Sequence, residues 1–212
     1  MYLIKSPFIL TEFSKKSITW KLAKDQKALY LTFDDGPVPE VTLEVLEILK
    51  LYNAKATFFM VGENAKRYPE IVDQVIAQGN SIGNHTFNHL NGMKVSDKAY
   101  FRNVLMAKEF VDSKLFRPPY GRIRPRQIKE LKKQYQIVLW SVLSGDFDQS
   151  IDDEKCLKNV IKNCKNGSII VFHDSLKAKP RMLFALKGTL EHFSKLGYQF
   201  LPIKQTKQND VS

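Results

Sequence analysis

The chain has 212 residues, of which 43% are hydrophobic and 26% are charged, with only 10 glycines and 9 prolines, so its composition excludes a disordered or fibrous protein and suits one globular domain. A net charge of +11 favours anionic surroundings such as nucleic acid, a phosphorylated polymer or an acidic membrane face. Because the lysines are spread along the chain and form no block with interleaved aromatic residues, we expect a solvated basic surface and no nucleic-acid partner.

Residues 1–27 carry no motif and are expected to form an extension packed on the domain, in which residues 18–22 could be an edge strand. Lys5, Pro7 and Glu12 interrupt the apolar N-terminus, which therefore lacks the apolar core of a secretory signal. No 18-residue apolar run follows that could span a membrane. The chain as given is expected in the cytoplasm, and action at the cell envelope stays open if a signal was removed or export is non-standard.

After this extension, short apolar runs alternate with segments of helical periodicity. The runs predict strands at residues 29–34, 56–61, 81–85, 115–116, 137–141, 168–173 and 198–202, and the periodic segments predict helices at residues 41–53, 69–79, 97–113, 125–135, 152–163 and 181–196. About seven βα units imply parallel strands joined by right-handed crossovers. Both a barrel and an open doubly wound sheet satisfy this alternation.

Polar side chains fall at or just after the carboxyl ends of five different predicted strands, at Asp34, His85, Arg117, Asp146 and His173. Barrels build their active sites at that end, whereas open sheets bind ligands at one switch point. Groups from five strands converge more easily in a closed or nearly closed barrel. We therefore favour an α/β barrel.

The two cysteines, Cys156 and Cys164, lie eight residues apart in what reads as one helix and its end. Eight helical residues rise about 12 Å, which is beyond disulfide reach unless the helix has already stopped. Neither cysteine has metal-ligand spacing. We expect both to be reduced and structural.

Two adjacent carboxylates, Asp34 and Asp35, end the first apolar strand before a Gly-Pro turn. Such a sequence can be a polar turn without a function. Successive side chains of an extended chain point to opposite faces, however, so the two carboxylates can also have different functions. His85 and His89 are four apart, and one helical turn would present both rings on one face. With Asp35 as third ligand they would form a His-His-Asp metal site beside Asp34, which could act as a base.

Five segments, in order, resemble the five motifs of the polysaccharide deacetylase family, which is named for the NodB domain. They are Thr-Phe-Asp-Asp-Gly-Pro at 32–37, His-Thr-Phe-Asn-His at 85–89, Arg-Pro-Pro-Tyr-Gly at 117–121, the stretch 140–147 and Ile-Val-Phe-His-Asp at 170–174. The resemblance covers about residues 28–203, which we expect to be the catalytic domain, with 204–212 as a polar tail. The family fold is a distorted, incomplete (β/α)7 barrel.

The resemblance implies a role for each motif residue. Asp34 would be the catalytic base, and Asp35, His85 and His89 the metal ligands. The remaining roles would fall to residues of the later motifs: a brace for the base (Arg117), an oxyanion-hole backbone N–H (Tyr120), the general acid (His173) and the carboxylate that tunes that acid (Asp146).

Substrate contacts are expected from Pro118, Trp140, Phe147 and Val171. Phe147 stands where the family commonly has tryptophan, and Val171 where it often has leucine. Both would line the pocket for the acetyl methyl group, so the departures bear on pocket size and leave the chemistry intact.

The implied function is a metal-dependent hydrolase that removes N-acetyl groups from N-acetylglucosamine-type residues of peptidoglycan or a chitin-like oligomer. Zn²⁺ is the expected ion, because it makes water acidic near neutral pH, and Co²⁺, Ni²⁺ or Mn²⁺ could replace it. The alternative is a catalytically silent carbohydrate-binding relative, against which the presence of Asp34, Arg117 and His173 argues. A monomer is favoured, and the partner is an N-acetylated glycan.

Overall fold

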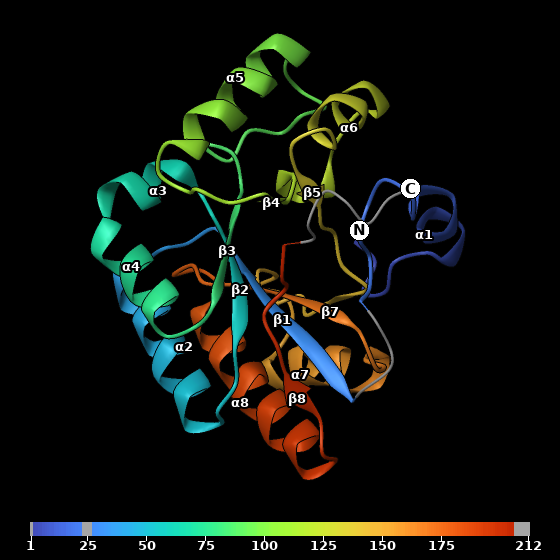
Figure 1. Ribbon diagram of the computed structural model, residues 1–212. Helices are drawn as coiled ribbons and strands as arrows, with labels where there is room; N and C mark the ends of the chain where they lie inside the picture. Colours follow the sequence, from blue (N-terminus) through green and yellow to red (C-terminus); the bar gives the residue numbers. More distant parts are fainter. Residues whose placement is uncertain (1, 23–26, 206–212) are drawn as a thin grey trace.

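The computed structural model describes residues 2–22 and 27–205 and contains a curled parallel sheet surrounded by helices (Figure 1). The strand order is β5-β4-β3-β2-β1-β7-β6, and β8 pairs with the start of β1. The strands are β1 (Ala28–Asp34), β2 (Ala56–Met60), β3 (Ser81–Asn84), β4 (Leu115–Phe116), β5 (Gln136–Ile137), β6 (Val142–Leu143), β7 (Ile169–His173) and β8 (Gln199–Phe200). The predicted incomplete (β/α)7 barrel is confirmed.

Helices cover the outer face of this sheet (Figure 1). The helices of the described residues are α1 (Phe8–Ser14), α2 (Pro39–Leu51), α3 (Gly62–Arg67), α4 (Pro69–Ala77), α5 (Asp97–Lys108), η1 (Pro119–Gly121), α6 (Pro125–Leu131), α7 (Asp153–Asn163) and α8 (Lys179–Lys195); of these, α1 belongs to the N-terminal segment and η1 lies at the cleft described below. Several begin where their sequence favours a start: Pro39, Pro69 and Pro125 are first-turn prolines. The side chains of Ser96 and Asp152 cap α5 and α7.

Strand β1 packs one face into the apolar core and presents polar side chains on the other. All seven of its residues are buried. Leu29, Leu31 and Phe33 join the core cluster that the outer helices close, and Phe33 stacks on Phe58 at a ring-centroid distance of 5.0 Å. The alternate residues Thr32 and Asp34 both accept hydrogen bonds from Arg117 instead. Strand alternation therefore places Asp34 on the polar side of a strand whose other face is core.

The N-terminal segment spans the opening between the sheet's two edges, β5 and β6. Thr19 pairs with Val138 beside β5, whereas Lys5 pairs with Val142 in β6. Backbone bonds reinforce both contacts, from Leu139 N–H to Thr19 at 2.9 Å and from Leu143 N–H to Ile4 at 2.8 Å. Residues 18–22 thus form isolated bridges and no regular strand, since the edge strands are only two residues long.

The elements expected from the sequence differ from those in the structure at several places. The helix expected to reach residue 113 ends at Lys108, and Ser113 Oγ donates to the carbonyl of Ile82 in β3 at 2.6 Å, which holds the chain beside β3 where β4 is about to begin. The strand expected at 137–141 is interrupted, since the carbonyls of Val138 and Leu139 accept bonds from Arg117. Helix α3, which lies between β2 and α4, was not predicted. The cysteines are free, as expected.

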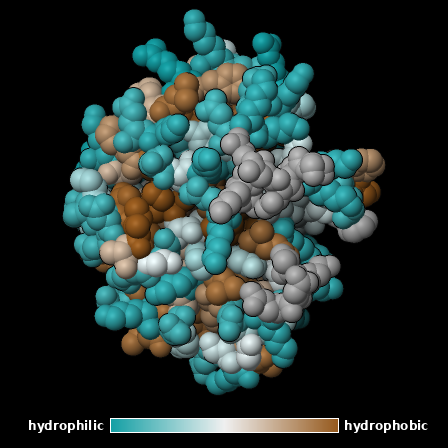
Figure 2. Space-filling model, viewed as in Figure 1, coloured by the Kyte–Doolittle hydropathy of each residue, from teal (hydrophilic) through white to brown (hydrophobic). Residues whose placement is uncertain are grey.

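The surface in the view of Figure 1 is mostly hydrophilic, with separate apolar patches (Figure 2). Apolar atoms show at the outer edge of α1, where Ile9 is 70% and Phe13 is 89% exposed. Within the described ranges, no helix has both the length and the apolar character needed to cross a bilayer. The predicted tail falls outside the described residues from position 206 onward.

Candidate active site

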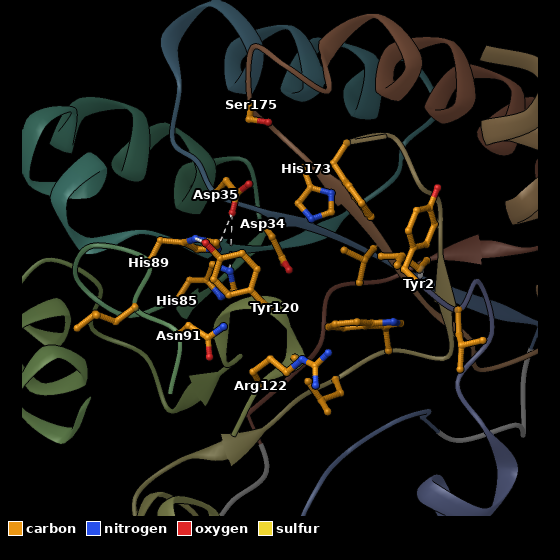
Figure 3. A pocket seen from close by; sticks show the side chains of 18 of the residues that line it. Tyr2, Asp34, Asp35, His85, His89, Asn91, Tyr120, Arg122, His173 and Ser175 are labelled. Carbon is orange, nitrogen blue, oxygen red and sulfur yellow. Dashed lines mark hydrogen bonds and ion pairs between the residues drawn. The ribbon is translucent and has the colours of Figure 1, made fainter. Parts of the chain in front are cut away.

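An open cleft of about 1220 Å³ lies at the carboxyl ends of the central strands. Asp34, Asp35, His85, His89 and His173 all line it. Figure 3 shows the two ligand-candidate histidines on one side of the aspartate pair and His173 on the other. The ends of β1, β3 and β7 supply these side chains, as expected for a barrel of this kind.

Asp35, His85 and His89 form a group able to hold a metal ion. Their donor atoms all lie within 4.8 Å of one another. Asp35 Oδ1 is 3.2 Å from His89 Nε2 and 3.8 Å from His85 Nε2. Two imidazoles and a carboxylate beside an open cleft are a suitable donor set for a catalytic divalent ion.

The two histidines do not share a helical turn, so that part of the sequence interpretation is wrong. β3 ends at Asn84, and the chain then bends, with positive φ at Thr86 (65°) and His89 (57°). Side chains stabilise the bend: Asn84 Oδ1 accepts from the Thr86 N–H, and Asn103 Oδ1 accepts from the Phe87 N–H, each at 2.9 Å. The bend and the strand end, rather than helical periodicity, bring the rings together.

His85 is prepared as a neutral ligand. Its Nδ1 lies 2.8 Å from the Arg117 carbonyl, which can only accept, so Nδ1 carries the proton and the Nε2 lone pair faces Asp35. Burial lowers the pKa of His85 to about 4, against opposing effects of nearby aspartates. The ring is therefore neutral at pH 7, which is the form that binds a metal.

Asp35 is aimed at the histidines by an unusual backbone conformation. Its φ is 84°, a region that costs energy for a non-glycine residue and often marks a functional site. Asn64 Nδ2 donates to the Asp35 carbonyl at 2.8 Å. Burial would raise the pKa of Asp35, but the His89, His173 and His85 imidazoles together hold it well below its usual range.

Asp174 stabilises the turn that follows Asp35 through hydrogen bonds to its carboxyl group. No role was assigned to it from the sequence. Its carboxyl accepts from the Gly36 N–H at 3.0 Å and from the Thr42 hydroxyl at 2.6 Å. It is 1% exposed, and burial raises its pKa to about 8 although these two bonds oppose the shift. A β-carbon on Gly36 would lie 2.0 Å from Asp174 Oδ2, so only glycine fits there.

Asp34 forms a buried ion pair with Arg117. Arg117 Nη1 donates to Asp34 Oδ1 at 2.6 Å, and the guanidinium stacks on Phe59 with Cζ 4.0 Å from the ring centroid. Arg117 is fully buried, which lowers its pKa, while Asp34 opposes that shift. Bonds to Thr32 and to the carbonyls of residues 138 and 139 use three of its four other N–H donors. Asp34 is thereby held in place and faces the cleft from beside Asp35.

His173 forms a second buried pair, with Asp146. Its Nδ1 lies 2.7 Å from Asp146 Oδ1, and its backbone N–H donates to Asp146 Oδ2 at 2.7 Å. Burial would lower the pKa of His173, but the Asp146 carboxylate outweighs it and raises the pKa to about 10. Arg181 Nε donates to the Asp146 carbonyl and anchors the loop. His173 is thus a cation at neutral pH, with Nε2 available toward the cleft.

Tyr120 sits at the cleft mouth in a left-handed conformation, with φ of 60°. Its N–H has no hydrogen-bond acceptor among the described residues. Its hydroxyl lies 3.1 Å from His89 Nδ1 and its ring centroid 4.6 Å from that of His89. If His89 binds through Nε2, its Nδ1–H donates to this hydroxyl.

The remaining expected substrate contacts divide into two groups. Trp140, Phe147 and Val171 line the cleft, whereas Pro118 lies behind it and accepts a bond from the Gly121 N–H. The sequence interpretation missed the N-terminal wall, formed by Tyr2, Leu3, Ser6, Pro7 and Trp20, and the rim residues Asn91, Lys94, Arg122, Ser175 and Lys177. No local pattern marks these positions. The roles of the predicted residues stay predictions.

Comparison with known proteins identifies the family. Residues 21–138 match the family model described as polysaccharide deacetylase. The chain belongs to the polysaccharide deacetylase family. The resemblance inferred from the five motifs is confirmed.

Named relatives of this family member are deacetylases of acetylated glycans. A peptidoglycan-N-acetylglucosamine deacetylase of Bacillus cereus is 37% identical over 195 residues, covering 89% of this chain and 92% of the relative. A chitooligosaccharide deacetylase of Azorhizobium caulinodans is 32% identical over 176 residues, covering 79% of this chain and 83% of the relative. The crystal structure of a peptidoglycan N-acetylglucosamine deacetylase superposes with a TM-score of 0.86 at 32% identity, covering 93% of this chain and 95% of that one.

Proposed function

We propose that this family member is a metal-dependent hydrolase that removes N-acetyl groups from N-acetylglucosamine-type residues of a glycan. The proposal rests on one observation: the Asp35–His85–His89 group lies in the same cleft as the Asp34–Arg117 and His173–Asp146 pairs. A carbohydrate-binding protein without activity has no need of a buried base and a charged acid. The names of the relatives point to the same reaction.

The residues fit a divalent ion, which Asp35 Oδ1, His85 Nε2 and His89 Nε2 would hold. The neutral state of His85 and the orientation of its Nε2 support this assignment. When bound, such an ion supplies Lewis-acid chemistry: it polarises a carbonyl oxygen and lowers the pKa of water toward 7. We propose Zn²⁺, because nitrogen ligands with one carboxylate suit it, and Co²⁺, Ni²⁺ or Mn²⁺ could substitute.

The protein's own groups would divide the proton transfers. Asp34, held by Arg117, takes the proton of the attacking water. The backbone N–H of Tyr120, which has no acceptor among the described residues, donates to the amide oxygen as it gains negative charge. His173, kept protonated by Asp146, gives its proton to the departing amine. Phe147 and Val171 receive the acetyl methyl group.

The cleft rim favours an anionic glycan over a neutral one. Lys94, Arg122 and Lys177 line the cleft and make no ion pair with an acidic residue of the described chain. Among the residues that the structure describes, the acidic ones in the lining are Asp34 and Asp35, at the centre. Unpaired cations around an open cleft suit a polymer that carries carboxylates, so we propose peptidoglycan as substrate, which would place the action at the cell envelope.

Acetate release tests the proposal. We expect release from peptidoglycan, with less from a chitin oligomer, and loss of release after chelation that added Zn²⁺ reverses. Asp34→Asn is the matched control, because it leaves the three ligands in place and removes the base. Release that survives both chelation and this substitution would contradict the proposed mechanism, and no release from any acetylated glycan would favour the silent relative.

A further inference from the structure

Residues 2–7 form one wall of the cleft by pairing with β6. Lys5 makes an antiparallel bridge with Val142, and the Leu143 N–H donates to the Ile4 carbonyl at 2.8 Å. Ser6 adds a side-chain bond from Oγ to the Trp140 carbonyl at 2.5 Å. These contacts fix the course of the segment, so the side chain at position 2 has a defined place in the cleft.

That side chain is Tyr2, which reaches the loop after β6. Its hydroxyl donates to Asp148 Oδ2 at 2.7 Å, and its ring centroid lies 4.9 Å from that of Phe147. Phe147 in turn packs edge-on against His173, with centroids 5.2 Å apart. Figure 3 shows Tyr2 beyond His173 at the edge of the cleft. The ring of Phe147 is therefore held between the N-terminal tyrosine and the expected general acid.

The position of Phe147 matters because it and Val171 line the space expected to take the acyl methyl group. The ring of Phe147 is partly buried, so its position depends on the side chains that pack against it. Tyr2 is one of them. A partly buried ring that loses such a neighbour gains freedom to move, and the neighbouring pocket can grow.

We propose that Tyr2 is a positioning residue that sets the size of the acyl pocket by holding Phe147 against His173. The proposal rests on the proposed deacetylase function for its substrate, but its geometry stands on contacts that do not depend on that function. The ring of Tyr2 supplies the packing against Phe147, and its hydroxyl makes a separate contact with Asp148 of the same loop. An aromatic ring at position 2 would therefore exclude acyl groups larger than acetyl.

The test compares release of acetyl and propionyl groups from matched N-acylated glucosamine oligomers. We expect Tyr2→Ala to shift the propionyl-to-acetyl ratio of kcat/KM upward by about tenfold, the scale of one methylene in an apolar pocket. Tyr2→Phe keeps the ring and should keep the ratio. Phe13→Ala, on the same N-terminal segment but 89% exposed, is the matched control. Tyr2→Leu replaces the alanine variant if that variant does not fold.

A second measurement separates this proposal from the proposed function. Nuclear Overhauser contacts between the Phe147 and His173 rings should be present in wild type and Tyr2→Phe, and weakened in Tyr2→Ala. An active Tyr2→Ala enzyme with a wild-type ratio overturns the proposal, and so do unchanged ring contacts in that variant. If wild type releases no acyl group, the proposed function fails and the ring contacts alone decide the positioning role.

Discussion

Replacing Asp146 by asparagine tests how the cleft keeps His173 protonated. Burial disfavours the charged ring, and the carboxylate 2.7 Å from Nδ1 overcomes this and raises the pKa from 6.5 to about 10. That net difference corresponds to about 5 kcal/mol in favour of the charged form, and it combines the cost of burial with the attraction of Asp146, Asp35 and Asp34. In Asp146→Asn we expect the His173 pKa to fall toward 6.5, because burial remains and the carboxylate that most strongly opposes it is gone, while Asp35 and Asp34 stay.

Stability should follow the same titration. A raised histidine pKa stabilises the fold fully below the unfolded-state value of 6.5, and this contribution is lost as the pH rises through about 10. The gap in unfolding free energy between wild type and Asp146→Asn should therefore be largest below pH 6.5 and shrink between pH 6.5 and 10. Urea denaturation across this range measures it.

Nuclear magnetic resonance titration of the His173 ring and the pH profile of acetate release complete the assay. If His173 is the acid, the alkaline limb of kcat/KM should move to lower pH in Asp146→Asn together with the ring pKa. A ring pKa that stays within half a unit of wild type would refute the assigned role of the carboxylate. A ring that titrates lower without any change in the rate profile would mean that the acid is another group.

Two further substitutions address the metal group and the buried ion pair. Asp35→Asn should weaken Zn²⁺ binding and regain part of its activity when excess Zn²⁺ is added, because it removes a ligand. Asp34→Asn should still bind Zn²⁺ but gain no activity from added metal, because it removes the base. Calorimetric titration with Zn²⁺ and acetate-release assays measure both effects, and the opposite pattern would reverse the two roles. Arg117→Gln should lower the unfolding free energy by about 3–5 kcal/mol in urea denaturation, because it leaves the buried Asp34 unpaired. Arg126→Gln is the control, since its side chain is 82% exposed and its loss should cost under about 0.5 kcal/mol; equal losses in both variants would contradict the argument.

The expected centre of the site could be read from the sequence because strand ends are local features. The runs before Asp34 and His173 are predominantly apolar strands, so the polar residues that end them were expected at one end of the barrel. The bend at His89 was misread as a helical turn, because spacing alone does not separate a helix from a bend stabilised by the distant Asn103. The wall formed by Tyr2 was missed because its partner Asp148 is 146 residues away.

The closure of the barrel by its N-terminal segment also bears on how the chain reaches its fold. Thr19 pairs with Val138 and Lys5 with Val142, so these pairs can form only after the ribosome has added more than a hundred further residues. Contacts between such distant residues slow folding, because a long loop must close before the contact forms. Until then the two-residue edges β5 and β6 are uncovered, and unpaired edges invite pairing with other chains. The opening of the barrel is therefore the place where a nascent chain is most exposed to aggregation, and the segment that seals it would be among the last to dock.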